Sequence, residues 1–117
     1  MTLFAVFEQK DVHKNLHPEW FTYSNSPEGA PENGLNPIIL RPKDDVILSG
    51  KITIPTYFEG HPVVGISGFS KGENSDPITH VFFENAMNSR VMTIYSNCFY
   101  MVNTLVYFEF PYSLQNI

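Results

Sequence analysis

Two histidines four residues apart give the clearest metal-ligand spacing in this sequence. His13 and His17 lie between Asp11 and Glu19, and histidines at positions i and i+4 of a helix can share one metal ion. Pro18 follows His17 directly, and it ends the single helical turn for which this stretch has room. We therefore expect histidines in a surface loop and no metal site.

The remaining chemical motifs are incomplete. Asp44 and Asp45 are half of a calcium site at most, because no loop of oxygen ligands with the right spacing follows them. Gly65-Ile-Ser-Gly68 is not the Gly-x-Ser-x-Gly elbow of a serine hydrolase. The sequence has no phosphate-binding glycine loop, and nothing in it points to the carboxylate pair of a glycosidase. We therefore expect no enzymatic activity and no cofactor.

Cys98 is the only cysteine, so an internal disulfide and a cysteine-based metal site are excluded. A reactive thiol needs a base or a cation nearby, and the closest cation in the sequence is Arg90. We expect Cys98 to be a small buried hydrophobe.

Charge narrows the class of protein. The 117 residues include 12 acidic and 7 basic side chains, for a formal net charge of −5. This length allows one domain with a modest core, and the singly scattered basic residues give no face for nucleic acid.

No apolar run is long enough for membrane insertion. The apolar start, residues 1–7, lacks the basic leader and cleavage site of a signal peptide. Either the chain stays in the cell that makes it, or Met1 is not its natural start.

The elements expected from the pattern are mostly short strands. Apolar, β-prone runs at 3–7, 20–23, 51–55, 78–83 and 105–111 predict strands, and shorter apolar runs occupy 37–40 and 45–48. Residues 24–37 are rich in Ser, Pro, Asn and Gly and contain Asn33-Gly34, which predicts a loop, mobile or ordered by a neighbour.

A repeat emerges when these strands are aligned. Ile52, Val81 and Phe108 fall in register at offsets of 29 and 27 residues, and Ile54, Phe83 and Phe110 follow two positions later. A second column of landmarks comprises Ile66, Ile94 and Ile117.

The last unit reads Ile94-x4-Phe99-x5-Leu105-x2-Phe108-x-Phe110-Pro111-x2-Leu114-x2-Ile117, and it resembles the BspA-like leucine-rich repeat. The resemblance covers about residues 50–117, and Glu84 departs from it by standing where the family has proline. It implies a mainly β chain, a short leucine-rich-repeat β-solenoid of about three irregular repeats. Residues 1–49 would form a strand-and-loop cap, and the last repeat within 50–117 would be incomplete. The segment 1–7 is similar to the end of a Listeria–Bacteroides repeat. The whole order of elements is similar to virion proteins of crAss-like gut phages.

This resemblance predicts which side chains face inward and which face a partner. The core should hold the landmark residues of both columns together with Phe99, Leu105 and Leu114. Side chains on the alternate strand positions should form an outer, partner-binding face: Lys51, Thr53, His80, Phe82, Tyr107 and Glu109. An alternative is that the N-terminal segment covers Phe82, with Trp20 or Phe21 packing on it. At the last repeat an open end is expected, which either continues into further chain or docks on a partner through Tyr112, Leu114 and Ile117.

The functional expectation is a structural module that binds protein to protein. From Asn85 to Ile117 only Arg90 and Glu109 are charged, so we expect another chain to cover part of this run. The favoured setting is a phage virion, as a tail, fibre or capsid-associated subunit among other protein subunits, with a homo-oligomer as one arrangement. The alternative is a fragment of a bacterial cell-surface adhesin that binds a host protein or glycan.

Overall fold

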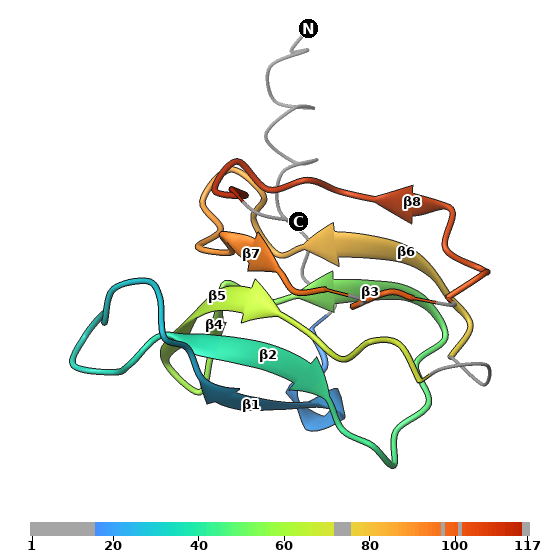
Figure 1. Cartoon of the computed structure of the whole chain (residues 1–117), viewed down its shortest axis with the longest axis horizontal. Coiled ribbons are helices and arrows are strands. Elements are labelled where there is room, and N and C mark those ends of the chain that lie inside the picture. The colour runs from blue at the N-terminus through green and yellow to red at the C-terminus, as the bar shows by residue number, and fades with distance from the viewer. Residues whose placement is uncertain (1–15, 72–75, 97, 101, 116–117) are drawn as a thin grey trace, which may run out of the picture.

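The computed structural model describes residues 16–71, 76–96, 98–100 and 102–115, and these form a mainly β structure (Figure 1). The predicted strand at 3–7 and most of the predicted helical turn lie outside the described residues. A 3-10 helix, η1, comes first, and eight strands follow it: β1 Phe21–Asn25, β2 Ile38–Pro42, β3 Gly50–Ile54, β4 Tyr57–Phe58, β5 His61–Ile66, β6 Ile78–Phe83, β7 Thr93–Ile94 and β8 Tyr107–Phe108. The helix η1 spans Pro18–Trp20, so Pro18 begins a helical turn where we expected it to end one. Its fixed φ suits the first position of a helix.

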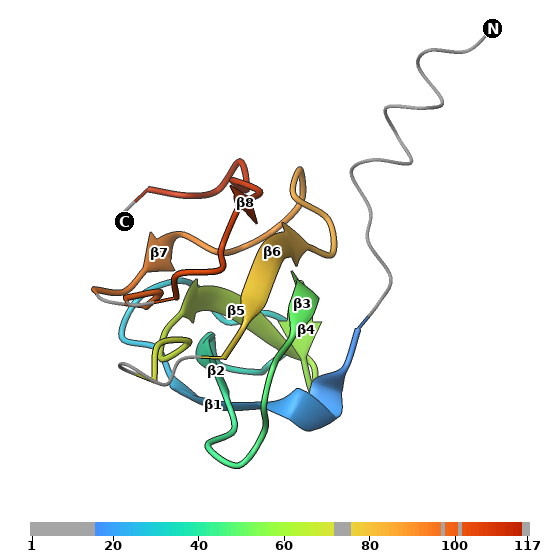
Figure 2. The same ribbon diagram turned by 90° about the vertical axis from the view of Figure 1, so that its right-hand side faces the viewer.

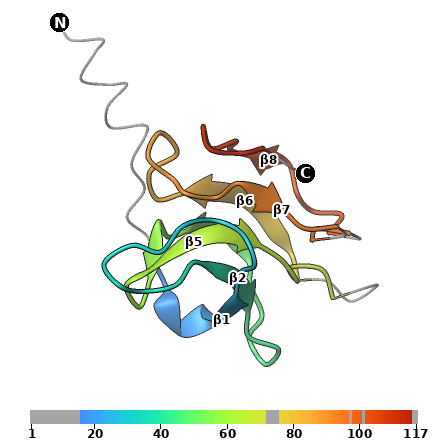
Figure 3. The same cartoon turned by 60° about the vertical axis from the view of Figure 1, so that its left-hand side comes forward.

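From β2 onward the chain passes back and forth between two sheets. One sheet holds β2, β5 and β7 in parallel, with β1 antiparallel to β2 and β4 antiparallel to β5. The other holds β3, β6 and β8 in parallel. Figure 2 shows the two sheets side by side, and Figure 3 shows the first of them with β1 at the bottom and β7 at the top. Each crossover between parallel neighbours therefore runs through a strand of the opposite sheet.

The register of the second sheet confirms the alignment of landmarks. Ile52 pairs with Val81, and Val81 pairs with Phe108. In the first sheet Ile66 pairs with Ile94 as aligned, and Leu40 pairs with Ile66 on the other side. The parallel stacking thus reaches back to β2, within the segment 1–49.

Two predicted apolar runs behave differently from their neighbours. The run 45–48 forms no strand, and its Ile47 is 76% exposed while Leu48 is buried. The run 105–111 is a strand only at Tyr107–Phe108. Beyond it the chain continues beside the preceding layer, since the N–H of Tyr112 donates to the carbonyl of Ala86 and that of Gln115 donates to that of Met92.

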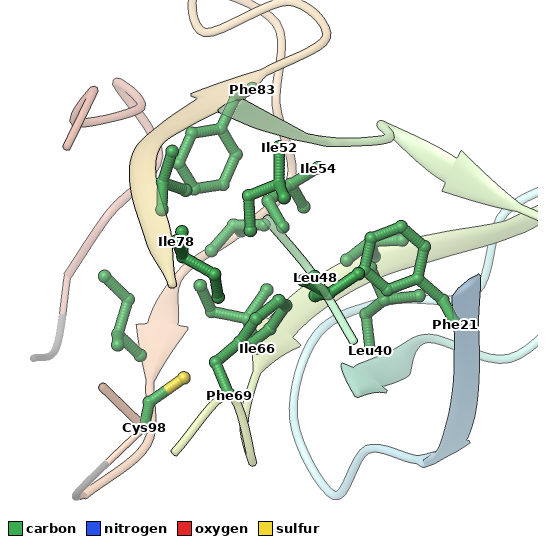
Figure 4. Packing of buried hydrophobic residues seen from close by; sticks show 14 of the residues in the cluster. Phe21, Leu40, Leu48, Ile52, Ile54, Ile66, Phe69, Ile78, Phe83 and Cys98 are labelled. Atoms are coloured by element: carbon green, nitrogen blue, oxygen red, sulfur yellow. The ribbon is translucent and has the colours of Figure 1, made fainter. Parts of the chain in front are cut away.

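The core lies between the two sheets. Figure 4 shows Leu40 from β2 and Ile66 from β5 pointing toward Ile52, Ile54 and the side chains of β6. Figure 4 draws 14 residues of this cluster as sticks, and Cys98 lies at its edge among aliphatic and aromatic side chains. At its margin the carboxylate of Asp76 is buried, where it accepts hydrogen bonds from the N–H of Leu48 and from Lys71, both at 2.9 Å. A buried carboxylate needs such partners.

Burial of equivalent core positions falls sharply in the last layer. Ile54 is 0% exposed and Phe83 is 1% exposed, but Phe110, which follows them in the same column, is 62% exposed. The expectation that Phe110 lies in the core is therefore wrong, because no described strand follows β8 to cover it. Phe108 is half-buried.

Three further predicted core residues in this last part of the chain, Phe99, Leu105 and Leu114, are also half-buried against the core. Ile117 lies outside the described residues.

This decrease in burial predicts that a Phe→Ala substitution lowers the free energy of unfolding by different amounts in successive layers. Phe83→Ala should lower the free energy of unfolding by about 3–5 kcal/mol, because it leaves a cavity in the core. Phe110→Ala should cost less than about 1 kcal/mol, since its ring is mainly in solvent. Urea denaturation followed by circular dichroism measures both. Equal losses would mean that Phe110 belongs to the core.

Candidate functional site

The outer face of β3, β6 and β8 carries an aromatic cluster. Because successive residues of a strand point to opposite faces, the register sets Lys51, His80 and Tyr107 in one column. Phe82 stands in the next column, and its ring centroid lies 5.5 Å from that of Tyr107 and 6.0 Å from that of His80. The His80 and Tyr107 centroids are 6.1 Å apart. The structure thus brings three of the predicted contact residues together, with Lys51 exposed beside them.

Two predicted outer-face residues, Thr53 and Glu109, are less accessible to a partner. Thr53 is only 6% exposed, because this short side chain lies beside the larger ring of its register partner Phe82; it offers a partner little surface. Glu109 is half-buried, and its Oε1 accepts a hydrogen bond from the N–H of Phe83 at 2.8 Å.

The two aromatic residues named in the alternative for Phe82 have other ring partners. Phe21 is 3% exposed in the core, with its ring 6.2 Å from that of Phe69. Trp20 stacks on His17 at 3.9 Å.

The first sheet, in contrast, has its outer face covered by the β1–β2 loop. Gly29 approaches Val64 of β5 so closely that a Cβ on it would lie 2.9 Å from a Val64 methyl. Glu28 Oε1 accepts hydrogen bonds from the hydroxyls of Thr93 at 2.5 Å and Tyr95 at 3.2 Å. In Figure 3 this loop passes in front of β5. The loop is therefore ordered by its own chain.

A second carboxylate of the same loop joins it to two other segments. Glu32 accepts hydrogen bonds from Tyr57 Oη at 2.7 Å and from Arg90 Nε at 3.0 Å, and the Arg90 guanidinium lies 5.3 Å from the Tyr57 ring centroid. The hydrogen bonds from Arg90 and Tyr57 hold the pKa of Glu32 below its ordinary value.

Exposed apolar side chains gather at the last layer, here called the open end: Val106, Phe108, Phe110, Tyr112 and Leu114. Val106 is 74% exposed and Tyr112 is 76% exposed, whereas Leu114 packs partly against the core. In Figure 1 β8 lies at the top of the stack, and its far edge pairs with no strand among the described residues.

Tyr112 and Leu114 were predicted here, and Ile117 lies outside the described part. Sequence reasoning missed Val106 and Phe110. The signal for both was their place in the last repeat, since the described residues hold no strand after β8.

The cavity beside η1 is small. It has a volume of about 170 Å³ and is lined mainly by apolar side chains, among them Leu16, Phe21, Pro55 and Phe58. Pockets for drug-sized ligands usually exceed about 300 Å³, so this cavity is smaller than most such pockets.

Comparison with protein-family models, with curated proteins and with solved structures found no match. Within the described ranges, no three His, Cys, Asp or Glu side chains group as metal ligands would. His17 instead lies 3.2 Å from Glu19, and His13 is outside the described part. None of the described helices has the length and apolar character to span a membrane.

Cys98 is buried, and burial raises the pKa of its thiol to about 12. Because the thiolate is the reactive form, native protein at pH 8 should react with iodoacetamide roughly a thousandfold more slowly than unfolded protein. Mass spectrometry of alkylation with and without urea measures the ratio. Equal rates would place Cys98 at the surface.

The anchoring of the loop by Glu32 predicts a dependence on pH. A carboxyl whose pKa is lowered in the folded state stabilises the protein above its unfolded pKa, near 4.5, and this contribution is lost as pH falls through the folded value. Glu32→Gln should therefore lose less stability than wild type on acidification below pH 4.5. Urea midpoints at a series of pH values measure this. Arg90→Met should show the same flattening, and an unchanged profile in both variants would contradict the anchor.

Proposed function

We propose that this chain is a non-enzymatic module that binds protein to protein, built as a short β-solenoid of the BspA-like leucine-rich-repeat type. The alternation of strands between two sheets supports this architecture, and so does the parallel register at repeat-like offsets. In such arrays each layer is covered by the next, and an uncovered layer invites association.

The single observation that carries the proposal is the uncovered core layer at the open end. Phe110 is 62% exposed and Tyr112 is 76% exposed, and Tyr107 on the adjoining outer face is 47% exposed. Together the three rings offer roughly 350–400 Å² of surface at about 200 Å² per ring. Burying it contributes about 9 kcal/mol before the costs of association are subtracted. A surface of this kind is the type that a partner covers.

The outer face of β3, β6 and β8 is the second contact surface in this proposal. Its cluster of His80, Phe82 and Tyr107 has the aromatic character of interface anchors. The β1–β2 loop covers the corresponding face of the other sheet.

For the setting we propose a subunit of a phage virion, in the tail, in a fibre or associated with the capsid. Support comes from the similarity in the order of elements and from the charge-poor run after Asn85. Quantitative mass spectrometry of purified particles and of bacterial cell envelopes tests it. We expect the chain at a fixed stoichiometry in particles. Its recovery with cell envelopes alone would favour an adhesin that binds a host protein or glycan.

The same preparation tests the outer face. Phe82→Asp and Tyr107→Asp should each reduce incorporation at least tenfold, because a charge replaces an apolar anchor. Ile47→Asp is the matched control, since Ile47 is 76% exposed and lies in the β2–β3 connection away from both surfaces. Circular dichroism checks the fold of all three variants. Incorporation at the wild-type level for both outer-face variants would exclude this face as a contact surface.

A further inference from the structure

We propose that the open end is closed by the open end of a second copy, with the two β8 strands antiparallel about a two-fold axis. This rests on the proposed function, in which the open end is a docking surface, and it names the occupant. The far edge of β8 has no partner strand among the described residues, and an identical edge strand pairs with it most directly when a two-fold axis relates the copies.

Charge favours a second copy at this place. The whole chain carries a net charge of −5, yet residues 91–117 contain one charged side chain, Glu109. Its carboxylate accepts the N–H of Phe83 in its own chain. Two copies that meet through other surfaces bring acidic groups together, whereas two open ends meet with little repulsion.

A two-fold axis placed beside Phe108 separates even these two carboxylates. If the axis passes beside Phe108, Tyr107 of one copy stands opposite Glu109 of the other. Glu109 therefore does not face Glu109, and like charges directly opposite each other are avoided.

The amount of exposed apolar surface suits a dimer. The three rings of the open end and β8 offer roughly 350–400 Å² per copy, before Val106 and the half-buried Phe108 and Leu114 are included. A stable interface buries about 800 Å² per partner, so these side chains supply an apolar centre of suitable size.

The opposite end of the stack argues against head-to-tail association. There β1 pairs antiparallel with β2 along residues 21–25 and 38–42, so the starting edge of the first sheet is already covered. An open end placed on it could not extend both parallel ladders. The contact between two open ends forms a closed dimer, whereas a head-to-tail contact forms filaments.

Sedimentation velocity of the purified chain from 1 to 200 µM tests the proposal. We expect a reversible monomer–dimer equilibrium that Val106→Asp and Phe110→Asp each weaken at least tenfold, while Ile47→Asp leaves it unchanged. A chain that stays monomeric at 200 µM overturns the proposal, as does a series of larger oligomers or equal weakening by Ile47→Asp. Circular dichroism confirms that each variant is folded.

Disulfide trapping tests the register. Since Cys98 is buried and its thiol hardly ionises, introduced cysteines are the reactive ones. A mixture of Tyr107→Cys and Glu109→Cys proteins should form the mixed disulfide faster than either protein alone forms its own. A dimer in which the mixed disulfide is not favoured overturns the antiparallel β8 contact.

The results that would exclude the proposed function differ from those that would exclude the dimer. If the chain is monomeric but Phe110→Asp still abolishes incorporation into particles, the second copy is excluded and docking through the open end stands. If the chain dimerises but incorporation is insensitive to both surfaces, the dimer stands and the proposed docking function is excluded.

Discussion

Among the described residues, each layer of core side chains except the last is covered by the layer that follows it along the chain. Parallel stacking makes this dependence strict, because the strands of one layer pair with the next layer in both sheets at once. Ile54 and Phe83 are fully buried by their successors, and Phe110 has none among the described residues. The loss of burial at β8 is thus a consequence of the architecture, and it explains why apolar exposure concentrates at one end.

Acidic side chains that follow two of the strands accept hydrogen bonds from backbone N–H groups. Glu84 follows β6 and accepts the N–H of Thr56 at 3.0 Å, and Glu109 follows β8 and accepts the N–H of Phe83 at 2.8 Å. In each case a carboxylate satisfies a backbone donor of the preceding layer near the point where the strand ladder ends. The hydrogen bond to Thr56 thus gives Glu84 a structural role at the end of β6.

Which features of the fold and the candidate site could be predicted from the sequence depends on whether they follow from a local pattern or from contacts between distant residues. The register of Ile52, Val81 and Phe108 could be predicted because a large apolar residue recurs three times at similar spacing in the sequence. The pairing of Leu40 with Ile66 was missed, since β2 precedes the recognisable repeat. The burial of Thr53 and the exposure of Phe110 depend on what lies beside and above them, and a single sequence does not encode that locally. The columns of the candidate site were therefore predictable, whereas their accessibility was not.

The β1–β2 loop has a consequence for the order in which the molecule can assemble. Its carboxylates bond to residues 58 to 67 positions further along the chain, Glu32 to Arg90 and Glu28 to Thr93 and Tyr95. The β1–β2 loop thus depends for these hydrogen bonds on residues around β7, which come much later in the chain. During synthesis the loop emerges long before these partners, and its hydrogen bonds to Arg90, Thr93 and Tyr95 form only when β7 has joined the first sheet. These bonds therefore report that the first sheet has reached β7, so that the earliest connection between strands in the described fold is completed late.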